Sequence, residues 1–262
     1  MRKTDFNDKR HEEVRSDDGS YTAYSKEYEE HYHSTKDGAL KESYEKHVIP
    51  AFKMKAHKKE LYILDICYGL GFNTLCTLLF YKENAPDTKL NIYSPELDEE
   101  LIKSLKHFSY PKEFEGLKEI IVKLSEDGVY EDDTLYIELF LGDAREYLRA
   151  LKERFFKEKK AFDIVYQDAF SPSANPTLWT KEYFADIKEL VKNDAILTTY
   201  SIALQIRLGL YENGFYIYLS KVEGIRPSTL ASLSLLDQVE LVDMEHKISC
   251  NKSIKPLSDR DL

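Results

Sequence analysis

The chain has 262 residues, of which 42% are hydrophobic and 32% charged, enough apolar material for one sizeable core. Its formal net charge of −10 argues against a broad basic surface for nucleic acid, although a local one is compatible with it. The sequence shows no apolar run typical of a membrane span or a signal peptide, so no membrane partner is expected. The 3 cysteines show no CxxC pairing, which predicts no metal site, no disulfide framework and a cytoplasmic location.

The first sixty residues are polar but rich in tyrosine and histidine. Aromatic side chains need a surface to pack on, so this composition argues against a disordered tail. We therefore expect residues 1–60 to form an N-terminal extension that packs on the mouth of the active site. A main domain is expected at residues 61–250 and a polar tail at residues 251–262.

From Leu61 onward, short β-type runs alternate with helical segments, the pattern of a parallel sheet covered by helices. Strands are predicted at residues 61–66, 90–94, 135–141, 162–167, 195–200, 215–220 and 229–233. Helices are predicted at residues 74–83, 99–108, 144–158, 177–191 and 203–212. No convincing helix separates the last two strands, so we expect them to form an antiparallel hairpin at the edge. The predicted fold is α/β, with a mostly parallel seven-stranded sheet.

A glycine-containing turn follows the first predicted strand and opens the first predicted helix. Gly69 and Gly71 permit positive φ angles and close approach of the backbone to a ligand. Only two glycines are present, so the G-x-G-x-x-G fingerprint is not satisfied, and a purely structural turn is an equal alternative. The second strand ends at Glu96, where a carboxylate can accept hydrogen bonds from ribose hydroxyls.

Carboxylates also follow the third and fourth predicted strands. Asp143 directly precedes a helix and is therefore expected as an N-cap, with an acceptor for an adenine amino group as the functional alternative. Asp168 ends the fourth strand on a loop that Pro172 and Pro176 stiffen, because proline lacks an N–H and fixes φ. Asn175 is expected to cap the helix that begins at Pro176. Taken alone, an aspartate at a strand end such as Asp168 is more often only a loop cap.

Four successive strands thus end in a glycine turn or a carboxylate, beginning with Asp65 and Gly69. Open α/β sheets bind ligands at this edge. No lysine follows the glycines to bind a phosphate, which argues against a nucleoside triphosphate. Acidic residues suit a cationic cofactor without phosphate, and S-adenosylmethionine carries a sulfonium and an ammonium. The edge therefore predicts a methyltransferase site.

The chain also resembles a known family, the methyltransferase domain of the tRNA wobble-uridine modification enzymes (MnmC-like). The resemblance runs from about Asp17 to about Leu233. Its most specific element is Asp168-Ala169-Phe170-Ser171-Pro172-x-x-Asn175-Pro176-x-x-Trp179, followed by Phe184. The other similar elements are Asp18-Gly19-Ser20, Tyr32-His33-Ser34, Gly38-Ala39, Glu42-Ser43, Gly69-x-Gly71-x-Asn73 and Gly142-Asp143.

The resemblance implies a Rossmann-like class I methyltransferase fold with S-adenosyl-L-methionine as cofactor. It further implies transfer of a methyl group to the exocyclic amine of a 5-aminomethyl-(2-thio)uridine at the tRNA wobble position, so tRNA is the expected partner. Carried over by position, the cofactor-binding residues would be Tyr32, Ser34, Glu42, Asp65, Gly69, Gly71, Asn73, Glu96, Asp143 and Asp168. The residues that receive the amine would be Asp168, Phe170, Ser171 and Pro172, with His33 helping to close the pocket. The flavin oxidoreductase domain of the larger members is not expected in this chain.

Two residues of the glycine turn depart from the family, which usually has a small residue at Cys67 and threonine at Leu70. Two alternatives therefore stay open. One is an aminopropyltransferase of the polyamine type, which shares the sheet and an aspartate at the end of the fourth strand. The other is a non-catalytic cofactor-binding relative, because fold alone does not fix function.

Basic residues offer a test of the tRNA prediction. They occur in two runs, Lys53–Lys59 and Lys152–Lys160, and as the pair Lys221 and Arg226. A tRNA-binding protein neutralises several phosphates, so these residues are expected on one face around Asp168 if RNA is the substrate.

Overall fold

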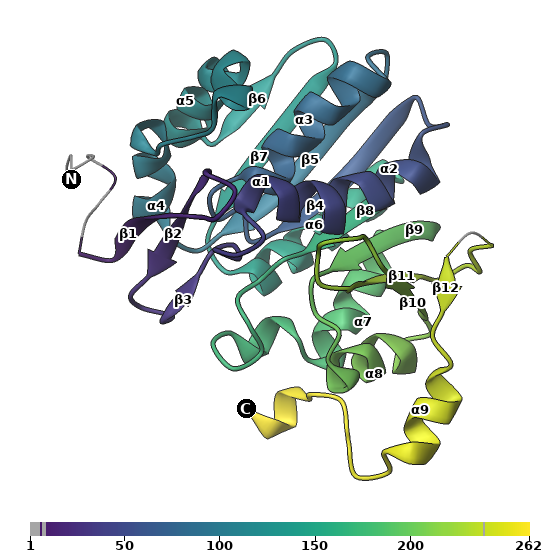
Figure 1. Cartoon of the computed structure of the whole chain (residues 1–262). Coiled ribbons are helices and arrows are strands. Elements are labelled where there is room, and N and C mark those ends of the chain that lie inside the picture. The colour runs from purple at the N-terminus through teal and green to yellow at the C-terminus, as the bar shows by residue number, and fades with distance from the viewer. Residues whose placement is uncertain (1–5, 7–8, 238) are drawn as a thin grey trace.

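The computed structural model describes residue 6, residues 9–237 and residues 239–262. Within these residues a large sheet crosses the molecule, with helices on both of its faces (Figure 1). In spatial order its strands are β12 (Glu240–Leu241), β10 (Tyr216–Ser220), β11 (Ser228–Ser232), β9 (Val191–Thr199), β8 (Phe162–Gln167), β4 (Glu60–Ile66), β5 (Lys89–Glu96), β7 (Leu135–Leu141) and β6 (Val129–Glu131).

The five central strands, β9, β8, β4, β5 and β7, pair in parallel. From β4 the chain moves outward through β5 and β7, and then returns to place β8 on the other side of β4. The sheet therefore changes direction between β4 and β8, and open α/β sheets bind ligands above such a point. The α/β fold with a mostly parallel sheet is confirmed.

Alternation along β4 divides the core into two layers. Leu61 and Ile63 belong to one buried cluster, and Leu64 and Ile66 belong to the other, as the two-residue period of a strand requires. The first layer lies under helices that include α2 (Ile49–Lys55), α3 (Phe72–Asn84), α4 (Glu99–Ser104) and α5 (Lys118–Asp127). The second layer lies under α6 (Ala144–Glu158), α7 (Lys181–Leu190) and α8 (Leu204–Glu212), and α9 (Met244–Cys250) packs on α8.

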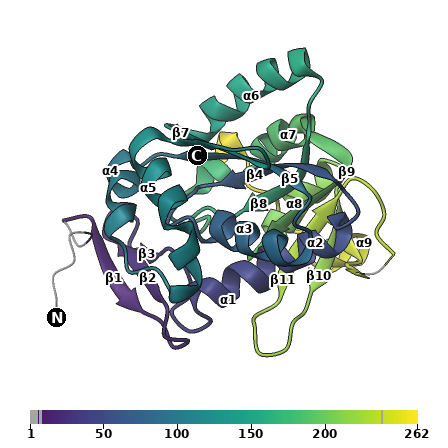
Figure 2. The ribbon, with the colours of Figure 1, turned by 90° about the horizontal axis from the view of Figure 1, so that it is seen from above.

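The described part of the N-terminal sixty residues is folded. It contains a separate antiparallel sheet of β1 (His11–Arg15), β2 (Tyr21–Ser25) and β3 (Glu30–His31). Next come α1 (Ala39–Ser43), the π-helical turn η1 (Tyr44–Val48) and α2, and α1 and η1 pack on α3. Figure 2 shows the small sheet to one side of the large one, with α1 beside α3. The division of the chain at residues 60 and 250 stays a prediction.

Several predicted elements require correction. The large sheet has nine strands among the described residues rather than seven, because β6 and β12 are too short to give an alternating pattern. The hairpin of β10 and β11 is antiparallel as expected, but β11 lies between β9 and β10, and β12 forms the outer edge. The helix predicted at 177–191 begins only at Lys181. A 3-10 turn, η4 (Pro176–Leu178), precedes it.

The expected cap at Asn175 is confirmed in position only, since Asn175 directly precedes Pro176 at the start of η4. Asn175 makes no capping hydrogen bond, and Thr180 caps α7 by accepting a hydrogen bond from the Tyr183 amide at 3.1 Å. The helix predicted at 99–108 consists of α4 and the 3-10 turn η2 (Leu105–His107). The 3-10 turns η3 (Lys112–Leu117) and η5 (Asp259–Asp261) were not predicted. In the described ranges no helix is long and apolar enough to cross a membrane.

Candidate active site

A cavity of about 460 Å³ lies at the carboxyl ends of the central strands, between the large sheet and the N-terminal sheet. Most of the predicted site residues line it: Tyr32, Ser34, Glu42, Gly69, Asn73, Glu96, Asp143, Asp168, Phe170 and Ser171. Three predicted site residues, Asp65, Gly71 and Pro172, are not part of its wall. The volume falls in the range of small-molecule and cofactor sites.

The glycine turn at the end of β4 forms the floor of one half of the cavity. Gly69 and Gly71 have φ angles of 54° and 77°, in the left-handed region that favours glycine. A Cβ at Gly71 would lie 2.6 Å from the Tyr68 ring, and one at Gly69 would lie 3.1 Å from the Tyr32 ring. Both glycines are therefore required by close packing, and the aromatic ring of Tyr32 lies directly over the turn.

Cys67 and Leu70, the two departures from the family pattern, take different positions. Cys67 has a φ of 64°, a strained angle for a residue with a side chain, and it lines the cavity. Burial raises the pKa of its thiol well above the ordinary value, which keeps the group neutral. Leu70 also lines the cavity, but its side chain is buried in the core, and its carbonyl accepts a hydrogen bond from the Tyr110 hydroxyl at 2.7 Å.

The carboxylates after β5 and β7 hold the backbone of the cavity wall. Glu96 accepts hydrogen bonds from the Gly69 amide at 2.8 Å and from the Asp98 amide at 2.9 Å. Burial raises the pKa of Glu96. Asp143 caps α6 by accepting from the Glu146 amide at 3.0 Å, as expected. Both side chains also face the cavity, so a role in cofactor binding stays a prediction for each.

Asp65 lies beneath the cavity, at the end of β4. It is 1% exposed, and its Oδ2 accepts a hydrogen bond from Thr74 Oγ1 at 2.7 Å. Burial raises the pKa of Asp65 to about 7, with a further contribution from the charge of Asp168. Among the described residues, Asp65 Oδ1 and Asn73 Oδ1 have no hydrogen-bond partner.

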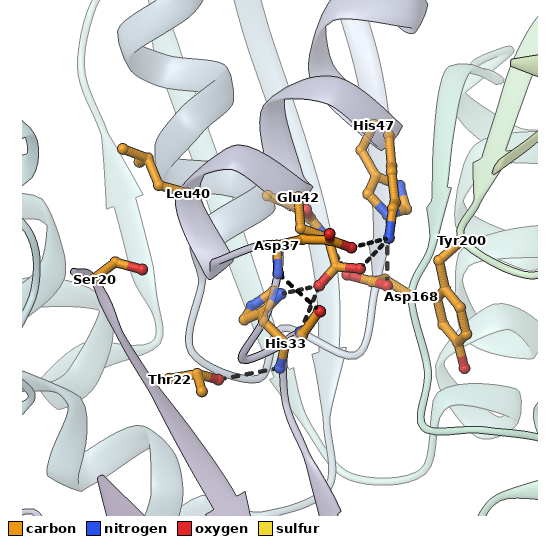
Figure 3. A network of polar contacts seen from close by, with 12 residues as sticks. Ser20, Thr22, His33, Asp37, Leu40, Glu42, His47, Asp168 and Tyr200 are labelled. Carbon is orange, nitrogen blue, oxygen red and sulfur yellow. Dashed lines mark hydrogen bonds and ion pairs between the residues drawn. The ribbon is translucent and has the colours of Figure 1, made fainter. Parts of the chain in front are cut away.

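Asp168 follows β8 and faces the cavity beside the glycine turn. Its Oδ2 accepts a hydrogen bond from Asn73 Nδ2 at 2.8 Å, and its Oδ1 lies 3.5 Å from His47 Nε2. Figure 3 shows Asp168 between His47 and Tyr200. Burial alone would raise the pKa of Asp168, but the imidazoles of His47 and His33 and the bond from Asn73 together lower it below its ordinary value. The cavity thus holds an ionised carboxylate.

The loop after Asp168 is fixed from both sides. The Trp179 indole N–H donates to the Phe170 carbonyl at 2.7 Å, which explains the tryptophan of the Asp-to-Trp motif. From β3, Glu30 accepts hydrogen bonds from the Ser171 amide at 3.0 Å and from the Ser171 hydroxyl. Tyr28 stacks on the Phe170 ring with centroids 4.8 Å apart. The N-terminal sheet therefore touches the loop that carries the carboxylate.

A buried polar network closes the N-terminal side of the cavity. Glu42 accepts a hydrogen bond from the Ser34 amide at 2.7 Å and forms an ion pair with Lys46. His33 Nδ1 lies 3.8 Å from the Glu42 carboxylate, and the His33 backbone amide donates to Thr22 Oγ1 at 3.1 Å (Figure 3). Burial lowers the pKa of His33. Glu42 thus acts here as a support for the chain segment that reaches the cavity.

Sequence reasoning missed His47, Glu30, Tyr28 and Tyr200. Tyr200 lines the cavity, and its hydroxyl donates to the Ala169 carbonyl at 3.0 Å. His47 is fully buried and reaches Asp168 from η1. Neither residue belongs to a recognisable motif, and their partners are far away in the sequence. Only the tyrosine- and histidine-rich composition of the first sixty residues indicated that this segment approaches the site.

A model of a protein family described as S-adenosyl-L-methionine-dependent methyltransferase matches residues 114–234. The crystal structure of MnmC2 from Aquifex aeolicus superposes with a TM-score of 0.82 at 29% identity, over 97% of this chain and 81% of that one. The chain has an MnmC-like methyltransferase domain. It is therefore related to S-adenosyl-L-methionine-dependent methyltransferases in sequence and in fold.

Two curated relatives match most of the chain. A protein of Methanocaldococcus jannaschii is 33% identical over 208 residues, which are 78% of this chain and 54% of that protein. The bifunctional protein MnmC of Psychrobacter cryohalolentis, named for tRNA 5-methylaminomethyl-2-thiouridine biosynthesis, is 26% identical over 275 residues. That match covers 93% of this chain and 37% of the relative. The MnmC-like domain thus spans about half of the first relative and just over a third of the second.

The cavity fits the cofactor of this family, S-adenosyl-L-methionine. Gly69 lines the cavity without a side chain, so a ligand can approach the backbone closely there. Carboxylates that face the cavity suit a cofactor with a sulfonium and an ammonium. Asn73 Oδ1, which finds no partner among the described residues, supplies a further acceptor at the start of α3.

Proposed function

We propose that this methyltransferase domain methylates a primary amine, the exocyclic amine of 5-aminomethyl-(2-thio)uridine at the tRNA wobble position. The observation that carries the proposal is the ionised Asp168, which faces the cavity next to the glycine turn. A carboxylate at this place can accept hydrogen bonds from an ammonium or an amine. Relatives named for tRNA 5-methylaminomethyl-2-thiouridine biosynthesis support the choice of amine.

The residues around the glycine turn are proposed to hold the cofactor. Glu96 would accept hydrogen bonds from the ribose hydroxyls, and Asp143 from the adenine amino group. Tyr32, whose ring lies over Gly69, would cover the bound cofactor together with Ser34. Asp65 and Glu42 would act indirectly, through Thr74 and through the Ser34 amide. S-adenosyl-L-methionine, when bound, supplies a methyl group on a sulfonium.

Asp168 is proposed to position the substrate amine. An amine attacks only through its lone pair, so the enzyme must orient this lone pair toward the methyl group. Asp168 can do so by accepting the N–H bonds of the amine, while Phe170 and Ser171 form the wall beside it. Pro172 would contribute only through the stiffness of the loop. Orientation of this kind supplies on the order of 7–11 kcal/mol in favourable cases.

The basic residues do not gather around Asp168 as a broad RNA-binding face would require. The run Lys53–Lys59 directly precedes β4 and the run Lys152–Lys160 precedes β8, so both lie at the amino edge of the sheet, opposite the cavity. The loop with Lys221 and Arg226 follows β10 at the carboxyl edge, where the Gly224 carbonyl accepts a hydrogen bond from Lys41 at 3.3 Å. A tRNA would therefore make its phosphate contacts through this loop and α1.

The decisive experiment examines the wobble uridines directly. Bulk tRNA from a strain that lacks this gene is digested and analysed by mass spectrometry. The unmethylated 5-aminomethyl nucleoside should accumulate, and purified protein with S-adenosyl-L-methionine should convert it to the methylated form. Unchanged wobble uridines in the deletion strain would contradict the tRNA substrate.

A small polyamine is the second candidate acceptor. It is favoured by the charge of the cavity wall, which includes Glu27, Glu30, Glu96, Asp98 and Asp168. A polycation needs no phosphate-binding surface, so it is also compatible with basic runs at the opposite edge. Incubation of the protein with labelled S-adenosyl-L-methionine and spermidine separates the two substrates. Label in spermidine but none in undermodified tRNA would replace the first proposal by this one.

A further inference from the structure

His47 is a buried titratable residue that the proposed reaction does not yet use. It lies in the π-helical turn η1, and such turns occur frequently at functional sites. His47 Nδ1 lies 2.8 Å from Thr198 Oγ1 on β9, and the ring packs edge-on against Tyr166 with centroids 5.8 Å apart. Its Nε2 faces Asp168 Oδ1 at 3.5 Å (Figure 3). The turn thus directs an imidazole at the back of the substrate-binding carboxylate.

His47 Nε2 and Asp168 Oδ1 face each other without an ordinary hydrogen bond. A distance of 3.5 Å exceeds that of an ordinary N–H···O hydrogen bond. Within the described part of the chain, His47 Nε2 has no other hydrogen-bond partner, although it is fully buried. If Nδ1–H donates to Thr198, the Nε2 lone pair faces the carboxylate. A proton placed between Nε2 and Oδ1 would satisfy both atoms, and catalytic contacts of this kind often tighten only with substrate bound.

The proposed reaction delivers such a proton. An alkylamine is mostly protonated at neutral pH, and an ammonium has no lone pair with which to attack a methyl group. One proton must therefore leave the substrate before transfer. In the proposed function Asp168 contacts the substrate, but a carboxylate is too weak a base to be the final acceptor of this proton. An imidazole is by nature a stronger base than a carboxylate, and it lies directly behind Asp168.

We propose that His47 is a positioning residue that receives, through Asp168, the proton which the substrate ammonium loses before methyl transfer. The inference rests on the proposed function. An N–H bond of the ammonium breaks, and its electron pair stays on nitrogen. The proton passes by way of Asp168 Oδ1 to His47 Nε2, which leaves an imidazolium beside a carboxylate. The freed lone pair then bonds to the methyl carbon while the bond from that carbon to sulfur breaks and leaves its electron pair on sulfur. The products are a secondary ammonium and S-adenosyl-homocysteine. After the product leaves, the imidazolium returns its proton to water through Asp168.

The charges around His47 favour this transfer. The carboxyl group of Asp168 lies 3.5 Å from the ring, so it stabilises an imidazolium there. The adjacent Lys46 is paired with Asp37 and Glu42, and burial lowers the pKa of the nearby His33. Thr198 and Tyr166 complete the surroundings with neutral side chains. The acceptor role is therefore specific to the side of the ring that faces Asp168.

The first test compares pH profiles of single-turnover methylation for the wild type and His47→Gln. Glutamine can still bond to Thr198 but cannot take up a proton. Its rate at pH 7 should fall about 100-fold, and the difference should shrink to less than about tenfold near pH 9, where the amine loses its proton to water. His33→Gln is the matched control, because His33 is also buried near Asp168 but is paired with Glu42. Its profile should keep the wild-type shape, whatever its effect on cofactor affinity.

The second test needs no variant and no turnover. In the wild type, nitrogen NMR of the imidazoles should show Nε2 of His47 without a proton at neutral pH. Addition of a synthetic anticodon stem–loop carrying 5-aminomethyluridine, with S-adenosyl-homocysteine present, should shift both ring nitrogens toward imidazolium values. The same addition to Asp168→Asn should leave the ring neutral, because the path for the proton is broken.

Three outcomes would overturn the inference. One is a His47→Gln profile that runs parallel to the wild type at all pH values. Another is a His47 ring that stays neutral with substrate bound, or that is already an imidazolium without it. In both cases the wild type still methylates the amine, so only the role of His47 is lost. A wild type that methylates no amine at all overturns this inference and the proposed function together.

Discussion

The strand β8 carries one aspartate at each end, and the two ends differ in what surrounds the carboxylate. At the amino edge, Asp163 is fully buried and accepts from both the Tyr62 amide at 3.0 Å and the Lys192 ammonium at 2.9 and 2.8 Å. At the carboxyl edge, Asp168 accepts a hydrogen bond from Asn73 and lines the cavity. Its second oxygen lies 3.5 Å from His47 Nε2. Asp163 is satisfied within the protein, whereas Asp168 retains capacity for a ligand.

The same contrast extends along the two edges of the sheet. At the amino edge Lys55 is buried and pairs with Asp194 at 2.8 Å. This basic residue therefore stabilises the fold and does not offer its charge to RNA. At the carboxyl edge several carboxylates hold backbone amides and still face the cavity. Unused hydrogen-bonding capacity, rather than charge alone, distinguishes a binding edge from a structural one.

The largest effect is expected when Asp168 and Asp163 are each replaced by asparagine in separate variants. Asp168→Asn should lower the single-turnover methylation rate about 1000-fold, because the amide cannot hold an ammonium or pass on its proton. Its affinity for S-adenosyl-L-methionine, measured by calorimetry, should stay within about threefold of wild type. Asp163→Asn should show the reverse, near-normal turnover with about 3 kcal/mol lower unfolding free energy. Equal losses of rate in both variants would remove the distinction between the two ends.

Asp65, at the carboxyl end of β4, should make the unfolding free energy depend on pH. Its folded pKa of about 7 lies above the ordinary value of 3.8, so the folded chain binds this proton more tightly than the unfolded chain. The stability that Asp65 contributes is therefore full below about pH 4 and is lost as the pH rises to about 7. Relative to wild type, Asp65→Asn should gain about 4 kcal/mol of unfolding free energy across this window. Urea unfolding at a series of pH values measures the gain, and a constant difference would contradict it.

The sequence predicted the parts of the fold that local patterns determine. The helix at 144–158 coincides with α6 because Asp143 caps it and apolar residues recur along one face. The carboxylates at the strand ends were found for the same reason, since a strand ends where its apolar run ends. The segment at 39–55 was missed because Pro50 interrupts the helical pattern and η1 departs from the period of 3.6 residues.

His47 and Glu30 could not be predicted for a different reason. Each acts on a partner more than 100 residues away, Asp168 for His47 and Ser171 for Glu30. No local pattern records which partner the fold brings close, and a lone histidine or glutamate has no motif. The nine-stranded sheet was underestimated in the same way, because β6 and β12 are defined by their partner strands.

The glycine turn allows a test of the carboxyl edge that leaves every carboxylate in place. Gly71→Ala puts a side chain at a φ of 77° and 2.6 Å from the Tyr68 ring. The strain lowers the unfolding free energy by about 2 kcal/mol. If the turn shifts to relieve it, binding of S-adenosyl-L-methionine should weaken about tenfold by calorimetry. Gly116→Ala is the control, since a Cβ there meets nothing within 4 Å. If the two variants bind equally well, the turn does not shape the cofactor site.

The smallest effect is expected where the N-terminal sheet holds the loop of Asp168. Glu30→Ala removes the acceptor of the Ser171 amide and hydroxyl, so the loop loses its contact with β3. Hydrogen bonds to a charged group contribute about 1.5–3 kcal/mol, so KM for the amine should rise about tenfold with kcat little changed. The control is Glu12→Gln on β1, an exposed glutamate of the same small sheet. A fall in kcat without a change in KM would instead mean that Glu30 orients Asp168 itself, which would extend the catalytic edge of the large sheet to a residue from the small one.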